Sequence, residues 1–104
     1  MEVQIHDRSH DVSAEESSHA EEKLAAVAAH SELVERAELE FDRDLKRRPN
    51  PLYVVKVTLR LLGHRMPDLR AHESGSELRT VVDQAMDKID RELSHLKERI
   101  KTQP

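Results

Sequence analysis

The sequence predicts an α+β domain in which two helices pack on one face of a four-stranded sheet, in the order β-α-β-β-β-α. Four short segments alternate apolar and polar residues, a pattern typical of strands with one buried face. Two longer segments repeat apolar residues at spacings of three and four, which is typical of helices with one buried stripe. Packing both stripes on one sheet face gives a two-layer fold. With 104 residues and no internal repeat, the chain is expected to form a single domain, residues 1–104.

A strand and a helix come first. Residues Glu2 to His6 alternate in polarity and predict a short strand. Ser13 and Glu16 have the spacing of a capping box, so a helix is expected to begin there and to run to about Ala29. The apolar stripe of this helix consists of Ala20, Leu24, Val27 and Ala28.

Three strands follow the first helix. Residues 34–42 and 53–61 alternate clearly, and the loop 45–51 between them contains two prolines, which interrupt regular structure. After a turn at residues 63–67, residues 68–73 are expected to form the last strand. The outward side chains of the third strand are polar and are expected to face solvent: Lys56, Thr58 and Arg60.

The C-terminal helix is the longest predicted element, and Ser74 or Ser76 is expected to cap its first turn. We expect the structured core to span residues 3–97 and the tail 98–104 to fray. The apolar residues of the helix recur along one face: Leu78, Val81, Val82, Ala85, Met86, Ile89, Leu93, Leu96 and Ile100.

Composition excludes several kinds of protein. The chain has no cysteine, which rules out a disulfide scaffold, a cysteine-ligated zinc site and a thiol nucleophile. Charged residues make up 37 % and aromatic residues 2 %, so the core must be mostly aliphatic. No apolar run approaches the ~20 residues that span a bilayer, so we expect no membrane contact and a cytoplasmic location. The net charge of −4 argues against indiscriminate binding to polyanions.

No catalytic or metal site is predicted, and we expect no enzyme activity, no cofactor and no small-molecule substrate. The acidic residues lie on helix and strand surfaces rather than as a pair in an apolar cleft. His6 and His10 straddle a strand end, and no carboxylate pattern completes a metal site with His64 and His72.

Basic side chains form two candidate contacts for phosphate groups. One candidate is a stripe that flanks the apolar face of the long helix: Lys88, Arg91, His95 and Arg99. The alternative for this stripe is a solvated helix flank held by weak ion pairs such as Asp87 with Arg91. The other candidate is a run in the loop between the second and third strands, for which the alternative is a loop that only increases solubility: Lys46, Arg47 and Arg48.

Three segments of the chain resemble the ribosome hibernation factors, the sigma-54 modulation protein family that includes hibernation promoting factor and ribosome-associated inhibitor A. They are VQIHDR at residues 3–8, EEKL at 21–24 and AMDKIDREL at 85–93. The likeness covers residues 3 to about 97, and the chain is similar to the short form, without a C-terminal dimerisation domain. The resemblance implies a fold similar to a double-stranded-RNA-binding domain.

The resemblance also implies a function without chemistry. Family members bind the small ribosomal subunit, occupy the channel for mRNA and tRNA, and block translation in stressed cells. They contact rRNA mostly through basic side chains of the two helices. Carried over by position, Lys23 matches the lysine of the first helix motif, Lys88 and Arg91 match the second helix motif, and Lys97 matches its later lysine.

Several positions depart from the family pattern. Ala26 stands where a second lysine is common, and Ser94 and His95 replace basic residues late in the second helix. Lys23 follows two glutamates and is equally compatible with a solvent-facing role. A protein-interaction or self-associating module, including a weak homodimer, that kept the fold and lost rRNA binding is therefore an alternative.

Overall fold

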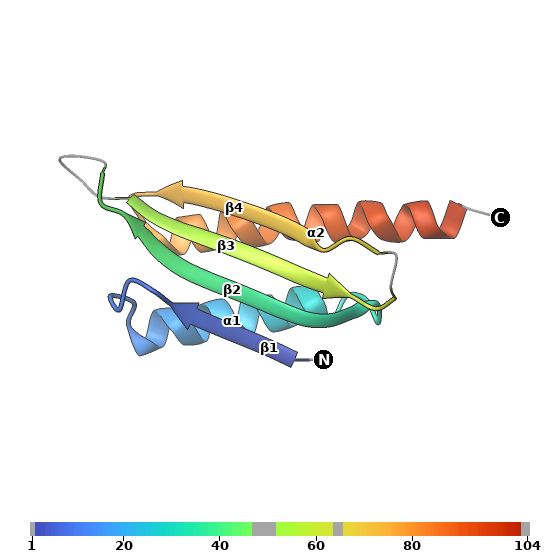
Figure 1. Ribbon diagram of the computed structural model, residues 1–104, viewed down its shortest axis with the longest axis horizontal. Helices are drawn as coiled ribbons and strands as arrows, with labels where there is room; N and C mark the ends of the chain where they lie inside the picture. The colour runs from blue at the N-terminus through green and yellow to red at the C-terminus, as the bar shows by residue number, and fades with distance from the viewer. Residues whose placement is uncertain (1, 47–51, 64–65, 103–104) are drawn as a thin grey trace.

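The computed structural model describes residues 2–46, 52–63 and 66–102 and shows two layers (Figure 1). A four-stranded sheet forms one layer, and the helices α1 and α2 lie side by side on one of its faces. The order of elements is β-α-β-β-β-α, as the sequence predicts. Neither helix is long and apolar enough in its described residues to cross a membrane.

The sheet follows the order of the chain. It consists of β1 (Glu2–Asp7), β2 (Val34–Asp44), β3 (Leu52–Leu61) and β4 (Leu69–Gly75). The strands β2, β3 and β4 pair antiparallel with their sequence neighbours. In contrast, β1 pairs parallel with β2, because α1 carries the chain back between them.

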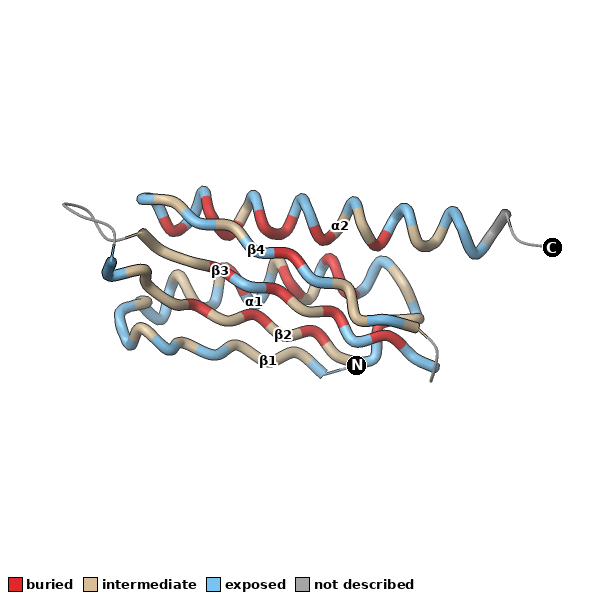
Figure 2. Tube along the Cα trace, turned by 45° about the horizontal axis from the view of Figure 1, so that its top comes forward, coloured by how far each residue is buried: buried red, intermediate tan, exposed pale blue. Residues whose placement is uncertain are grey.

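Alternation along the central strands places one apolar row against the helices. From Ala37 to Phe41 in β2 and from Val55 to Leu61 in β3 every second residue is buried, and the two rows meet in register (Figure 2). Among the residues that the structure describes, no polar or charged residue is buried. The centre of the core consists of the pairs Ala37 with Leu59, Leu39 with Val57, and Phe41 with Val55.

Helix α1 (Ala14–Ala28) begins and packs as the sequence predicts. The Oγ of Ser13 accepts a hydrogen bond of 3.1 Å from the backbone N–H of Glu16 and donates one of 2.9 Å to its carboxylate. This satisfies one of the N–H groups that a helix start leaves unpaired. All four residues of the predicted apolar stripe are buried.

Helix α2 (Leu78–Thr102) continues past the sheet (Figure 1). It reaches five residues into the tail that the sequence predicts to fray. The predicted apolar residues from Leu78 to Leu93 are buried, and Leu96 is partly buried. The expectation for Ile100 is wrong, since this side chain is 42 % exposed. The last turns extend beyond the strands, so the sheet offers Ile100 no surface to pack on (Figure 2).

The N-terminus of α2 differs from the prediction. Ser74 lies within β4, and Ser76 lies two residues before the first helical residue. The carbonyl of Glu77 accepts a 3.0 Å hydrogen bond from the N–H of Val81, which places the cap at Glu77. Its carboxylate also accepts a 3.1 Å hydrogen bond from the hydroxyl of Thr80.

The connection from β4 to α2 is tight at Gly75. A Cβ at this position would lie 2.9 Å from Cγ2 of Val81, which is itself buried in the core. The glycine therefore permits the first turn of α2 to pack closely on the end of β4.

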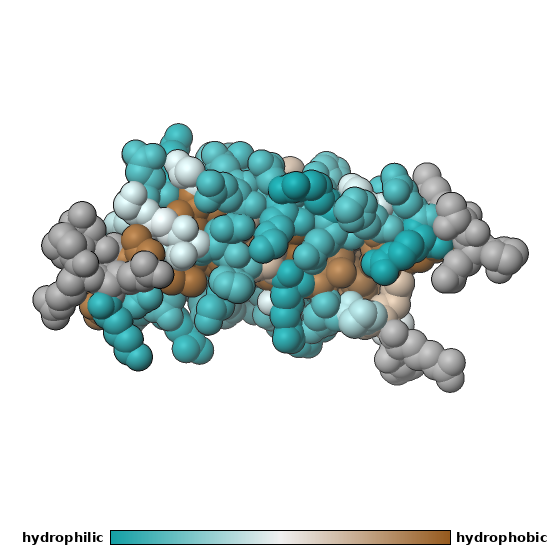
Figure 3. Space-filling view, turned by 90° about the horizontal axis from the view of Figure 1, so that it is seen from above, coloured by the Kyte–Doolittle hydropathy of each residue, from teal (hydrophilic) through white to brown (hydrophobic). Residues whose placement is uncertain are grey.

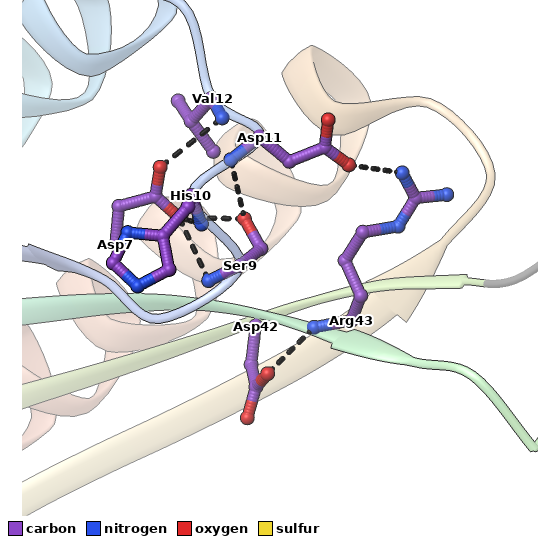
Figure 4. Close-up of polar contacts among 7 residues, drawn as sticks. All are labelled: Asp7, Ser9, His10, Asp11, Val12, Asp42 and Arg43. Atoms are coloured by element: carbon purple, nitrogen blue, oxygen red, sulfur yellow. Dashed lines mark hydrogen bonds and ion pairs between the residues drawn. The ribbon is translucent and has the colours of Figure 1, made fainter.

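The turn between β1 and α1 is organised by the carboxylate of Asp7 (Figure 4). It accepts hydrogen bonds from the N–H groups of Ser9, His10 and Val12 at 3.0–3.1 Å, and from the Ser9 hydroxyl at 2.5 Å. Burial alone would raise the pKa of Asp7, but these hydrogen bonds outweigh it and hold the pKa below its ordinary value. The ionised carboxylate thus stabilises the turn.

Replacing Gly75 with alanine is expected to destabilise the protein by about 1–3 kcal/mol, because the buried Val81 side chain has little room to move. Urea denaturation measures the change, with the exposed neighbour Ser74→Ala as the control. A variant that combines Gly75→Ala with Val81→Ala should show less than the sum of the two losses. Equal or greater stability of Gly75→Ala would contradict this packing.

Replacing Asp7 with alanine is expected to cost about 1–3 kcal/mol, because three N–H groups lose their acceptor. Since the folded-state pKa is lowered, the ionised carboxylate stabilises the fold at pH values above about 4, its unfolded pKa. That contribution is lost as the pH falls through the folded-state pKa.

The stability difference between wild type and Asp7→Ala should therefore shrink on acidification. Thermal melts between about pH 7 and about pH 3 measure it. Asp87→Ala, at an exposed position of α2, is the control for the loss of one carboxylate. If the stability difference between wild type and Asp7→Ala stays constant with pH, the ionised carboxylate is not the cause of the lost stability.

Candidate nucleic-acid interface

One flank of α2 faces β4 and carries most of the predicted basic stripe. The Nζ of Lys88 lies 3.8 Å from the carboxylate of Glu73 in β4, which fixes the direction of this flank. His95 and Arg99 follow seven and eleven residues later, close to whole numbers of helical turns, so they lie on the same flank. All three basic residues are exposed.

The opposite flank of α2 faces α1 and uses two candidate lysines in internal contacts. The Nζ of Lys23 in α1 lies 2.7 Å from the carboxylate of Asp83 in α2, and the His19 ring lies 3.5 Å from it. Further along, the Nζ of Lys97 donates a 2.6 Å hydrogen bond to the carbonyl of His30. The structure therefore places Lys23 and Lys97 in the seam between the helices.

A second acidic residue of α2 completes this seam. The carboxylate of Asp90 lies 2.8 Å from Nδ1 of His30, whose carbonyl accepts the hydrogen bond from Lys97. The ammonium of Lys23 has the largest effect on Asp83 and lowers its pKa below the ordinary value, against a smaller opposing effect of burial. His19 lowers that pKa further. The seam thus combines carboxylates of α2 with cationic and imidazole groups of the α1 segment.

The remaining candidates do not form one site. Arg91 is exposed, and its Nε donates a 3.4 Å hydrogen bond to the backbone carbonyl of Asp87, rather than pairing with the Asp87 carboxylate as the plain alternative supposed. Lys46 is exposed just after β2, at the end of the molecule where α2 begins, so it lies far from His95 and Arg99 (Figure 1). Arg47 and Arg48 lie outside the described residues.

The match to a protein-family model decides the family. The model for the sigma 54 modulation protein / S30EA ribosomal protein family matches residues 3–101. The chain belongs to this S30EA family. The resemblance noted in the sequence is thereby confirmed over nearly the whole domain. A comparison with curated protein sequences gives no match.

Two solved structures confirm the fold of this S30EA domain. A ribosomal subunit interface protein from Coxiella burnetii superposes with a TM-score of 0.75 at 20 % identity, over 94 % of this chain and 99 % of that one. The N-terminal domain of Protein Y from Thermus thermophilus gives a TM-score of 0.71 at 17 % identity, over 92 % of this chain and 99 % of that domain. At such identities the likeness extends to the arrangement of elements and not to individual side chains.

The helical layer of this S30EA domain is not uniformly basic. Helix α1 carries four carboxylates and one lysine, and α2 carries five carboxylates and six lysine or arginine residues. Cations are therefore available only where they lie away from the carboxylates. In the part of the chain that the structure describes, no group of three or more histidine, aspartate or glutamate side chains could hold a metal ion.

Sequence reasoning missed the acidic partners in the seam. Asp83 and Asp90 lie seven residues apart, so they share one flank of α2, and His19 and Lys23 lie four apart on α1. This spacing was a signal for two facing stripes of opposite charge. Nothing local in the sequence, however, indicated that these two stripes face each other.

The Lys23–Asp83 ion pair of this S30EA domain is expected to stabilise it weakly, because both side chains are more than 40 % exposed. A double-mutant cycle with Lys23→Ala and Asp83→Ala should give a coupling energy of about 0.2–1 kcal/mol that decreases in about 1 M NaCl. The same cycle on Lys88 and Glu73, separated by 3.8 Å, is the comparison and should give a smaller coupling. Absence of coupling at low salt would contradict an ion pair between the helices.

Proposed function

We propose that this protein binds the small ribosomal subunit and inhibits translation by occupying the channel for mRNA and tRNA, as a hibernation factor. The observation that carries the proposal is the family match over residues 3–101. The family includes the S30EA ribosomal protein, and the similar structure from Coxiella burnetii is that of a ribosomal subunit interface protein. The inferred location is the cytoplasm, where ribosomes act.

The exposed cations of α2 are the proposed contacts with rRNA. Lys88, Arg91, His95 and Arg99 lie on the β4-facing flank and the outer surface of α2, on a rigid helix that is anchored by seven buried side chains. Folded RNA is recognised largely through its shape and its phosphates, and such contacts need cations held at fixed positions. Because the chain has only one tyrosine, one phenylalanine and no tryptophan, and Phe41 is buried, we do not expect stacking of bases on these rings to supply much of the affinity.

Lys23 and Lys97 are proposed as secondary contacts. Each already has an internal partner, a carboxylate for Lys23 and a backbone carbonyl for Lys97. A phosphate would have to replace or share that partner, so the gain from each contact is smaller than for an unpaired cation. Lys46, Arg47 and Arg48 lie next to the proline-containing segment between β2 and β3 and are proposed to reach RNA at the other end of the molecule.

The internal pairing also supports a second candidate function. A domain in which helix cations such as Lys23 and Lys88 already pair with its own carboxylates is suited to bind another protein or a second copy of itself. The edge strands β1 and β4 each pair on one side only within the described sheet, which leaves backbone groups for such association. Solution dimers that persist at high salt without RNA would favour this function.

Sedimentation with purified small ribosomal subunits tests the proposal. The protein is expected to co-sediment at about 50 mM salt and to dissociate progressively towards about 200 mM, because phosphate contacts release counterions. Equal binding at both salt concentrations would contradict a contact made through phosphates. Absence of binding at both would reject the ribosome as the partner.

Charge reversal on α2 tests which surface makes the contact. Lys88→Glu and Arg91→Glu should each weaken binding to the subunit by about tenfold, because each removes a cation and introduces repulsion. Arg8→Glu is the control with the same change in charge, at a residue 71 % exposed that pairs with Glu40 on the far side of the sheet. Normal binding of both α2 variants would show that this helix flank does not face the RNA.

A further inference from the structure

The face of the sheet that carries no helix is highly charged, and its charges are segregated by strand. Glu38 and Glu40 of β2 point to this face, and Lys56 of β3 is the register partner of Glu40. On β4, His72 is the partner of Lys56, and Arg70 is the partner of Thr58. The face is therefore acidic on β2 and basic on β3 and β4.

The acidic half of this open face is largely neutralised by its own cations. Glu40 pairs with Arg8 at 2.7 Å. Arg36 lies 3.4 Å from both Glu38 and Glu2. Two arginines thus balance three carboxylates on the strands β1 and β2.

The basic half is different, because its cations have few partners. Lys56 and Arg60 are exposed and make no ion pair with any residue that the structure describes. Arg70 is 74 % exposed and has only a 3.5 Å contact with Asp68. His72 is also exposed. The open sheet face therefore carries several cations, Lys56, Arg60 and Arg70, that are not neutralised by a close carboxylate of the described residues.

A groove collects these groups at the β4 edge. It encloses about 690 Å³ and extends from the open sheet face to α2. Figure 3 looks onto this edge and shows mostly hydrophilic residues, with hydrophobic residues visible mainly in a band along the middle. The polar side chains that line the groove are those of Lys56, Thr58, Arg70, His72, Lys88 and Glu92.

We propose that this β4 groove binds the phosphate backbone of RNA. Same-face neighbours along a strand lie about 7 Å apart, and diagonal neighbours across strands lie about 7–8 Å apart, so Lys56 and Arg70 present separate cations to one strand of phosphates. A protein partner would need apolar anchors, and the exposed large hydrophobic residues, Leu45, Leu62 and Ile100, do not line the groove. Nucleic-acid interfaces are positively charged, and in this groove the cations of Lys56, Arg70 and Lys88 outnumber its one carboxylate, Glu92.

The inference deepens the proposed function and rests on it for the identity of the RNA. Lys88 belongs both to the groove and to the α2 flank proposed to contact the ribosome. The RNA contact would then continue from α2 around β4 onto the open face of the sheet. The groove would supply cations that the acidic helical layer lacks.

Binding of a fluorescein-labelled RNA hairpin to the whole protein, followed by anisotropy over a range of salt concentrations, tests the groove. The variant with Lys56→Glu and Arg70→Glu should bind at least about fivefold more weakly and lose about two units of salt slope. The control with Arg8→Glu and Arg79→Glu has the same net charge and two exposed positions that do not line the groove. It should stay within about twofold of wild type.

Other outcomes would overturn the proposal. Equal losses of affinity in both double variants would show that RNA binding depends on the overall charge. No loss of affinity in the groove variant would exclude the groove as the binding site. Displacement of the hairpin by poly-glutamate as efficient as by unlabelled RNA would assign the groove to acidic polypeptides. Circular dichroism of each variant verifies that it is folded.

Sedimentation of the same variants with small ribosomal subunits separates this inference from the proposed function. If wild type binds the hairpin through the groove but does not bind the subunit, the ribosome proposal fails and the groove remains. If wild type and the groove variant bind the subunit and the hairpin equally well, the groove fails and the ribosome proposal remains.

Discussion

The structure depends on one apolar layer between the helices and the sheet. Every charged group of the described residues must therefore lie on the outer side of one of these two layers. The described core residues are all hydrophobic, and they come from one face of the sheet and one stripe of each helix. With 37 % charged residues, the chain has to place its ionic groups on the outer side of the helices or on the open side of the sheet. On these surfaces the charged side chains lie close together and in contact with water, so each ion pair contributes little to stability. Which cations are paired with carboxylates then determines what ligands the surface can bind.

Alternation and helical spacing were sufficient to predict the order of elements, the two-layer packing and the buried residues of β2, β3 and α1. Each of these is a local property, because the side-chain period follows directly from the backbone. The errors have a different origin. Ile100 continues the apolar pattern of α2 but lies beyond the sheet, and the cap at Glu77 in place of a serine depends on how β4 enters the helix.

The candidate site was less predictable, because the groups that pair with a charged side chain come from distant parts of the chain. His30 and Asp90, sixty residues apart, meet only when α1 and α2 lie side by side on the sheet. For this reason the sequence predicted the basic candidates but did not show that Lys23 and Lys97 have internal partners. Conversely, Lys56 was expected only to face solvent, and its lack of an ionic partner became visible only with the strands in register.

The parallel pairing of β1 with β2 has a consequence for the order of folding. The strands from β2 to β4 and helix α2 contact their neighbours in the chain, whereas β1 reaches its partner only by way of α1. Closing short loops costs less entropy than closing long ones, so the β2–β4 hairpins with α2 form the kinetically favoured nucleus. During synthesis β1 is made before β2 and stays without a strand partner until β2 has emerged. A strand that is made early therefore joins the sheet late.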